Sequence, residues 1–259
     1  EGIEDNIYSS TANGVYSKYS IKTYGDTIHS FIEDSKFSGC WSPGFIEIKS
    51  NSNSVADNSL VKIDHIVGNV EEGKMDEWKN FYETIFGFTT FVRFDDSDIS
   101  TQYSALRSIV MRSKNWKVKL PINEPASGLK NSQIQEYLDF NEGPGVQHVA
   151  ILSDNIINSI TQLRNNGVTF LDTPDTYYES LHNRVKDIDE DIEVLKQLKI
   201  LVDQDDEGYL LQLFTQPLED RPTLFIEIIQ RKGSRGFGQG NFQALFESIE
   251  KEQALRGNL

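Results

Sequence analysis

Three side chains that can bind a metal lie inside apolar segments of the sequence. His65 and His148 are two of only four histidines, each within a run of β-branched residues, and Glu227 lies within the segment TLFIEIIQ. A buried imidazole requires a hydrogen-bonding partner, and an unpaired buried carboxylate either stays protonated or needs a compensating cation. Arg231 could supply that cation, but one metal ion would satisfy all three groups.

Two imidazoles and one carboxylate would leave the other positions around a metal open. This facial arrangement suits non-haem Fe(II) oxygenases, because adjacent open positions accept a chelating substrate and oxygen together. Zinc uses the same ligand types and is the competing metal. A single histidine in an apolar strand is more often an ordinary core residue, so the spacing of the three residues has to be considered as well.

The elements around these residues follow the same order twice. The first half predicts a strand, an amphipathic helix and three strands at residues 60–70, 75–86, 89–94, 104–111 and 117–122, before a turn-rich segment at 123–130. The second half predicts a strand, a helix and two later strands at residues 146–152, 156–166, 210–214 and 224–230. We therefore predict an α+β fold of two tandem β-α-β-β-β modules. The intervals of 148 − 65 = 83 and 227 − 148 = 79 residues place the candidate ligands on matching strands, and a metal site and an ordinary core are then equally supported.

The remaining segments are less regular. Residues 1–14 show no period, residues 15–24 and 45–48 read as strands, and residues 50–59 read as a polar linker. Residues 174–199 are a charged insertion that predicts a solvated helix packing one apolar stripe. From Asn241 onward, an amphipathic helix is predicted by apolar residues at helical spacing, namely Phe242, Leu245, Phe246 and Ile249.

The composition excludes several classes of partner. The formal charge is 25 − 40 = −15, and such an acidic surface repels phosphate backbones and anionic lipids, so neither nucleic acid nor a membrane is expected as a partner. No segment approaches the length of a membrane helix, and no signal pattern opens the chain. The single cysteine, Cys40, cannot form an internal disulfide and is expected to be a semi-buried structural thiol. We expect a cytoplasmic protein.

Six segments, in order along the chain, closely resemble the 4-hydroxyphenylpyruvate dioxygenase family. They are DHIVGNV, GVQHVAILSD, DTYYESL, LLQLF, RPTLFIEIIQRKG and GFGQGNFQALFESIEKEQALRGNL, and the resemblance extends from about Val15 to the C-terminus. It implies the vicinal-oxygen-chelate fold, in which two modules form a half-open barrel around the metal and a C-terminal amphipathic helix covers the site.

The resemblance also implies roles for particular residues. Fe(II) would be held by His65, His148 and Glu227. Catalytic roles would fall to polar residues near the metal, namely Gln133, Gln147, Gln212 and Asn241. The substrate would contact a second set that includes an aromatic wall, namely Ser108, Asn123, Phe214, Phe237 and Phe242. Neutral amides can hold a phenol or a developing phenolate.

The implied reaction converts 4-hydroxyphenylpyruvate and O2 to homogentisate and CO2 in tyrosine and phenylalanine catabolism. The α-keto acid substrate would chelate the metal itself, so no separate 2-oxoglutarate is required. One alternative is 4-hydroxymandelate synthase, which hydroxylates the side chain of the same substrate, although Phe237 and Phe242 favour the dioxygenase. Another is a metal-free binding module with the same barrel.

The resemblance divides the chain at the polar linker. Residues 1–59 would be the remnant of an N-terminal domain with its linker, and residues 60–259 the catalytic domain, with modules at about 60–125 and 145–232 and a terminal helix at about 240–257. The sheet edges left exposed favour a homo-oligomer, either a dimer or a tetramer. Gly236, Gly238 and Gly240 do not fit a phosphate-binding loop and instead predict a hinge that lets the terminal helix close over the pocket.

Overall fold

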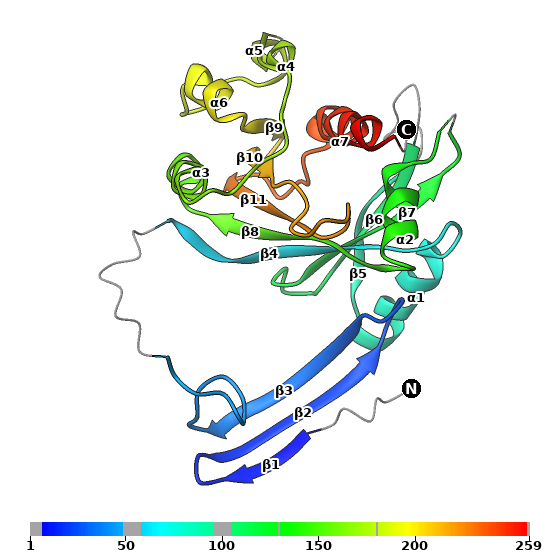
Figure 1. Ribbon diagram of the computed structural model, residues 1–259, viewed down its shortest axis with the longest axis vertical. Coiled ribbons are helices and arrows are strands. Elements are labelled where there is room, and N and C mark those ends of the chain that lie inside the picture. The colour runs from blue at the N-terminus through cyan, green and yellow to red at the C-terminus, as the bar shows by residue number, and fades with distance from the viewer. Residues whose placement is uncertain (1–6, 49–57, 96–104, 129, 180, 258–259) are drawn as a thin grey trace. The chain divides into compact units, whose positions relative to one another are not determined.

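The computed structural model describes residues 7–48, 58–95, 105–128, 130–179 and 181–257 (Figure 1). The chain divides into two compact units, residues 1–56 and 57–259. Within the described residues, no helix is both long and apolar enough to cross a membrane.

The first unit is a three-stranded antiparallel sheet in the order β1-β2-β3. Its strands are Ile7–Thr11, Gly14–Lys22 and Ile28–Phe37. The expectation of an irregular segment up to residue 14 is therefore wrong where β1 lies, and residues 45–48 form no strand. Cys40, expected to be semi-buried, is exposed.

The second unit contains both predicted modules. The first module has the order strand, helix and three strands: β4 Leu60–Asn69, α1 Met75–Phe86, β5 Thr89–Phe94, β6 Ala105–Arg112 and β7 Lys119–Ala126. The second repeats it with β8 Gly145–Ser153, α3 Ile156–Asn165, β9 Leu201–Asp205, β10 Gly208–Phe214 and β11 Phe225–Lys232. A short helix joins the modules, α2 Gln133–Phe140, capped by the side chain of Ser132. The predicted α+β vicinal-oxygen-chelate fold is confirmed.

One mixed sheet contains all eight strands of the second unit. Its order is β5-β6-β7-β4-β8-β11-β10-β9. The two module-opening strands, β4 and β8, pair antiparallel at its centre, and each has a parallel neighbour from the end of its own module, β7 or β11. The sheet is curled into a half-barrel, and residues of both modules line one cavity within it.

The insertion between α3 and β9 differs from the single solvated helix that was expected. It forms three short helices, α4 Asp175–Glu179, α5 Leu181–Arg184 and α6 Ile192–Leu198. Their apolar side chains enter the main hydrophobic core beside α3 and β10, and Leu181 and Leu195 are fully buried. The insertion is thus an integral part of the second module.

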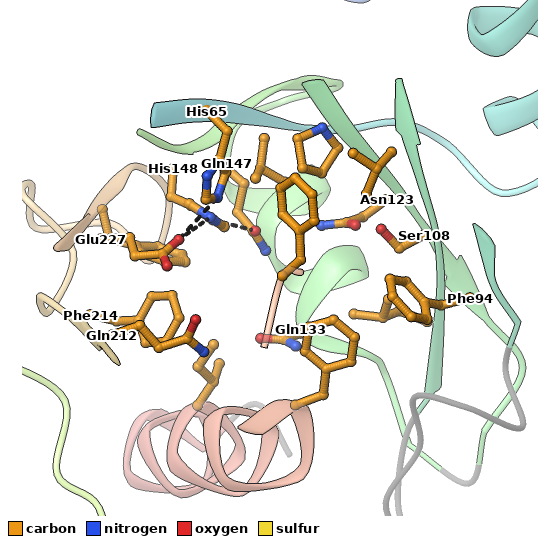
Figure 2. A pocket seen from close by; sticks show the side chains of 18 residues that line it. His65, Phe94, Ser108, Asn123, Gln133, Gln147, His148, Gln212, Phe214 and Glu227 are labelled. Atoms are coloured by element: carbon orange, nitrogen blue, oxygen red, sulfur yellow. Dashed lines mark hydrogen bonds and ion pairs between the residues drawn. The ribbon is translucent and has the colours of Figure 1, made fainter. Parts of the chain in front are cut away.

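The terminal helix α7 spans Phe242–Arg256 and follows a short 3-10 turn at Gln239–Asn241. Of its predicted apolar stripe, Phe242 and Ile249 line a cavity, whereas the side chains of Leu245 and Phe246 lie outside the described residues. In Figure 2, α7 lies on the side of that cavity opposite the strand of His65.

Candidate active site

The three candidate ligands converge within the half-barrel. His65 on β4, His148 on β8 and Glu227 on β11 each offer one ligand atom, and these atoms lie within 4.8 Å of one another. The Nε2 atoms of His65 and His148 lie 3.1 and 3.2 Å from the same oxygen of Glu227, Oε2. All three residues are buried.

Strand register explains this convergence. Ala150 on β8 is the partner of His65 across the antiparallel ladder and of Glu227 across the parallel one. The three residues therefore form one row on one face of the sheet, and His148 lies two residues from Ala150 on that same face. Because Ala150 contributes only a methyl group, the longer side chains on either side can meet above it.

A β-bulge precedes each histidine. Between Ile63 and His65, β4 advances two residues while β8 advances one, which places the extra residue at Asp64. Between Val67 and Gly68 the opposite occurs, and the extra residue is Gln147 on β8. A bulge disturbs the usual alternation of faces and redirects side chains. Each bulge residue can therefore contact the histidine that follows it.

The bulge residues fix the orientation of both imidazoles. His65 Nδ1 lies 2.8 Å from Asp64 Oδ1, and His148 Nδ1 lies 3.0 Å from Gln147 Oε1. Since a carboxylate or amide oxygen can only accept, each Nδ1 carries the proton and donates it. Both Nε2 atoms are then free to bind a cation, which is the usual arrangement of a metal-ligating histidine.

Electrostatics at this centre favour a cation. Burial by itself raises the pKa of Glu227, but the two imidazoles outweigh burial and hold that pKa at about 2. Burial by itself lowers the pKa of His65, but Glu227 and Asp64 outweigh it and raise the pKa. At His148 burial prevails and lowers the pKa. The buried carboxylate thus remains ionised and requires positive charge beside it.

All but one of the twelve predicted site residues line one cavity beside the three ligands (Figure 2). The polar lining residues come from four further elements: Ser108 from β6, Asn123 from β7, Gln133 from α2 and Gln212 from β10. Ser108 and Asn123 are direct partners across the β6–β7 ladder.

Asn241 is the exception, because it does not line the cavity. It is fully buried in the 3-10 turn before α7, and its Oδ1 lies 2.7 Å from the hydroxyl of Tyr177 on α4. The neighbouring Gly240 donates its N–H to Asp203 and accepts from Arg184. The insertion and β9 therefore anchor the start of the terminal helix.

The polar groups of the cavity retain unused hydrogen-bonding capacity. Gln133 is buried, yet its Oε1 has no partner among the residues that the structure describes. Buried polar atoms are almost always satisfied, so such an atom in a cavity favours a polar ligand. Asn123 donates to Asn69 at 3.3 Å.

Aromatic side chains lie beside the candidate metal ligands and along the cavity wall. The ring of Phe237 lies 5.0 Å from that of His65, and the ring of Phe225 stacks on that of His148 at 4.9 Å. Phe242 packs edge-on against Phe94 at 5.1 Å. Phe225 and Phe94 were not predicted from the sequence, although Phe225 shares the face of Glu227 at a spacing of two residues, which is a usable signal.

Comparisons with known proteins agree with this geometry. Residues 62–213, more than half of the chain, match the family model described as the Glyoxalase/Bleomycin resistance protein/Dioxygenase superfamily. The chain belongs to this superfamily.

Several similar proteins carry one name, 4-hydroxyphenylpyruvate dioxygenase. The protein from Yarrowia lipolytica is 48% identical over 256 residues, covering 96% of this chain and 65% of the relative. That from Coccidioides posadasii is 51% identical over 255 residues, covering 95% and 64%, and that from Danio rerio is 50% identical over 251 residues, covering 93% and 63%. The chain thus spans slightly less than two thirds of these relatives.

Two solved structures are also similar. A triple mutant of 4-hydroxymandelate synthase from Streptomyces coelicolor superposes with a TM-score of 0.71 at 31% identity, covering 92% of this chain and 67% of the other. A fusion of a xylose isomerase-like TIM barrel with a 4-hydroxyphenylpyruvate dioxygenase gives a TM-score of 0.60 at 28% identity, covering 74% and 29%.

Proposed function

We propose that this chain is the catalytic part of an Fe(II)-dependent dioxygenase that converts 4-hydroxyphenylpyruvate and O2 to homogentisate and CO2 in tyrosine and phenylalanine catabolism. The observation that carries the proposal is the meeting of His65, His148 and Glu227 at the wall of a cavity lined by neutral amides. Identity of 48 to 51% to relatives named for this activity supports it.

The donor set fits iron. Two neutral imidazoles and one ionised carboxylate form the facial triad that leaves adjacent positions open, and the buried charge of Glu227 calls for a cation. His65, His148 and Glu227 would hold Fe(II), and the bound ion would supply a centre for keto-acid chelation and oxygen activation. Asp64 and Gln147 hold the Nδ1 protons away from the metal side of the imidazoles.

The other cavity residues bind and enclose the substrate. Gln133, Gln147 and Gln212 offer neutral donors and acceptors that suit a phenol or a developing phenolate, while Ser108 and Asn123 provide further polar contacts. The aromatic wall formed by Phe214, Phe237 and Phe242 excludes water from reactive species. Since Asn241 lies outside the cavity, its role in catalysis is indirect, through the start of α7.

Two alternative functions remain testable. A 4-hydroxymandelate synthase would share the site and the substrate, but the similarity to a structure of that name is 31%, well below that to the dioxygenases. A metal-free binding module would have to balance the buried Glu227 with a protonated His65 alone, and its site would stay empty when Fe(II) is offered.

Product analysis decides among these functions. The chain is loaded anaerobically with Fe(II), supplied with 4-hydroxyphenylpyruvate and air, and the products are identified by mass spectrometry. We expect homogentisate and CO2 in equal amounts. Formation of 4-hydroxymandelate would assign the synthase. Metal analysis that finds the site empty after loading, with no oxygen uptake on addition of the keto acid, would support the metal-free binding module.

Two further expectations belong to the same proposal. We propose a homo-oligomer, because apolar side chains on β1 and β3, among them Tyr8, Phe31 and Ile32, are exposed on the isolated chain. Light scattering would give the number of subunits. We also propose a cytoplasmic location, which fractionation of cells would test.

A further inference from the structure

Asp64 is a buried carboxylate that lies beside the metal centre but does not line the cavity. It is 6% exposed and accepts from three side chains. His65 Nδ1, Lys119 Nζ and Arg231 Nη2 lie 2.8, 2.9 and 2.8 Å from its Oδ1, and Arg231 Nε lies 2.9 Å from its Oδ2. Two cations therefore balance this carboxylate while it orients one imidazole.

Arg231 extends this network to the cavity wall. It lies four residues after Glu227 on β11, hence on the same face of the strand, and its guanidinium reaches in two directions. One edge forms the bidentate pair with Asp64, and Nη1 donates to the carbonyl of Gly236 at 2.7 Å. The same guanidinium lies 5.6 Å from the ring centre of Phe237.

These contacts form a closed ring of neighbouring residues. It runs from His65 through Asp64 and Arg231 to Gly236 and Phe237, and the ring of Phe237 returns to within 5.0 Å of the ring of His65. A metal ligand and a wall of the cavity thus share one support. A planar guanidinium suits this role because it donates in several fixed directions at once.

We propose that Asp64 and Arg231 are positioning residues: Asp64 directs Nε2 of His65 at the metal, and Arg231 fixes Phe237 relative to that histidine. The inference rests on the proposed metal site. The two bulge residues then have different roles in the two modules. Gln147 is neutral and lines the cavity, whereas Asp64 is charged and only positions the imidazole of His65.

The proposed role of Asp64 is tested by measuring metal affinity, without turnover. Co(II) is titrated anaerobically into the chain and followed by its visible d–d absorption. We expect Asp64→Ala to weaken Co(II) binding about 10- to 100-fold, the usual effect of losing an outer partner of a ligand, and Asp64→Asn to restore part of it because an amide oxygen can accept from Nδ1. Asp76→Ala removes a carboxylate from an exposed pair with Arg93 and serves as the matched control.

A merely structural role would lower the melting temperature of the metal-free chain and leave the Co(II) affinity of the folded protein unchanged. That result for both Asp64 variants would overturn the proposal. Absence of Co(II) binding by the unaltered chain would instead refute the metal site itself, so the two failures are distinguishable.

The proposed role of Arg231 is tested by measuring metal binding and turnover separately. Arg231→Lys keeps the positive charge beside Asp64 but cannot reach Asp64 and Gly236 together. We expect Co(II) affinity within about threefold of the unaltered chain, with a raised KM for 4-hydroxyphenylpyruvate as Phe237 loses its support. An unchanged KM would show that Arg231 does not position the wall.

Discussion

Ala150, a residue with an unreactive side chain, determines how closely the proposed metal ligands can approach one another. It is fully buried between His65 and Glu227 in the row across three strands. We expect Ala150→Leu to separate the ligands and weaken Co(II) binding at least tenfold, because extra methylenes in a packed interior displace their neighbours. Ala150→Ser, which adds one atom, is the control. Equal affinities in the leucine variant and the unaltered chain, with the fold intact by circular dichroism, would contradict the account.

The ionised centre gives the metal-free chain a defined dependence of stability on pH. Glu227 has a pKa lowered from 4.5 to about 2, so its contribution is present above pH 4.5 and is lost as the pH falls towards 2. His65 has a pKa raised from 6.5, so its contribution is present below pH 6.5 and is lost as the pH rises through the higher value. Both contributions coexist between these limits.

We therefore expect Glu227→Gln to lower the melting temperature in EDTA most between about pH 4.5 and 6.5. At higher pH both imidazoles are neutral and the buried carboxylate lacks a counter-charge, so the glutamine variant should approach or exceed the unaltered chain. Melting temperatures measured across this range test the prediction. A difference in melting temperature between the variant and the unaltered chain that does not vary with pH would show that Glu227 and His65 are not coupled.

The sequence indicated the three candidate ligands but not the contacts that hold them in place. His65, His148 and Glu227 stand out because polar, titratable residues are rare inside apolar strands. Asp64 and Ala150 are ordinary in sequence, and Arg231 was expected only as a possible counter-charge for Glu227, whereas it pairs with Asp64. The roles of these residues depend on a bulge and on strand register. Both are set by tertiary pairing and leave no local pattern.

Among the elements, the insertion helix α4 anchors the start of the terminal helix α7 through the contact between Tyr177 and Asn241. Tyr177→Phe removes the hydroxyl that lies 2.7 Å from Asn241 Oδ1, leaving the buried amide without that partner at a cost of about 1–3 kcal/mol. We expect faster hydrogen exchange in α7. Tyr178→Phe is matched to it, because that hydroxyl bonds to Ile200 instead. Similar exchange in both variants would show that Tyr177 does not anchor α7.

The loop before α7 constrains one of the cavity amides. Gly238 has a φ of 74°, and a Cβ there would lie 2.5 Å from Gln212 Nε2. We expect Gly238→Ala to displace that amide and raise KM for the keto acid about tenfold without changing Co(II) affinity, because the glutamine is not a ligand. Gly87 also has a positive φ, 63°, but a Cβ there would meet no neighbouring atom, so Gly87→Ala controls for backbone strain alone. Equal KM values for the Gly238→Ala variant and the unaltered chain would exclude Gln212 from substrate binding.

The bounds of the elements with clear periodicity were predicted well. The bounds of the other elements were not, and each difference has a physical reason. The bounds of α1 and β5 agree with their apolar patterns. The last strand of the first module was expected to end at residue 122, but it continues to Ala126 despite Pro121 and Pro125. These prolines are tolerated because β7 pairs with β4 only at Ile122 and Asn123, so few ladder bonds are lost. Almost all of β3 is exposed, so it lacks the alternation that reveals a strand.

For the molecule as a whole, the proposed metal site takes its ligands from both modules, which also meet along the β4–β8 pair and at the Asp64–Arg231 ion pair. His65 comes from the first module, and His148 and Glu227 from the second. The repeat itself was visible in the sequence. The closure of both modules around one centre was not visible in the residues, and it was expected only from the resemblance to a known family.

His65, His148 and Glu227 are proposed to bind one Fe(II) that a keto acid can chelate. Anaerobic titration of the chain with Fe(II) in the presence of 4-hydroxyphenylpyruvate tests this proposal most directly. We predict a weak visible charge-transfer band that saturates at one equivalent of iron and disappears in Glu227→Gln. A colourless complex, or a band that persists after both His65 and His148 are replaced by alanine, would contradict the account.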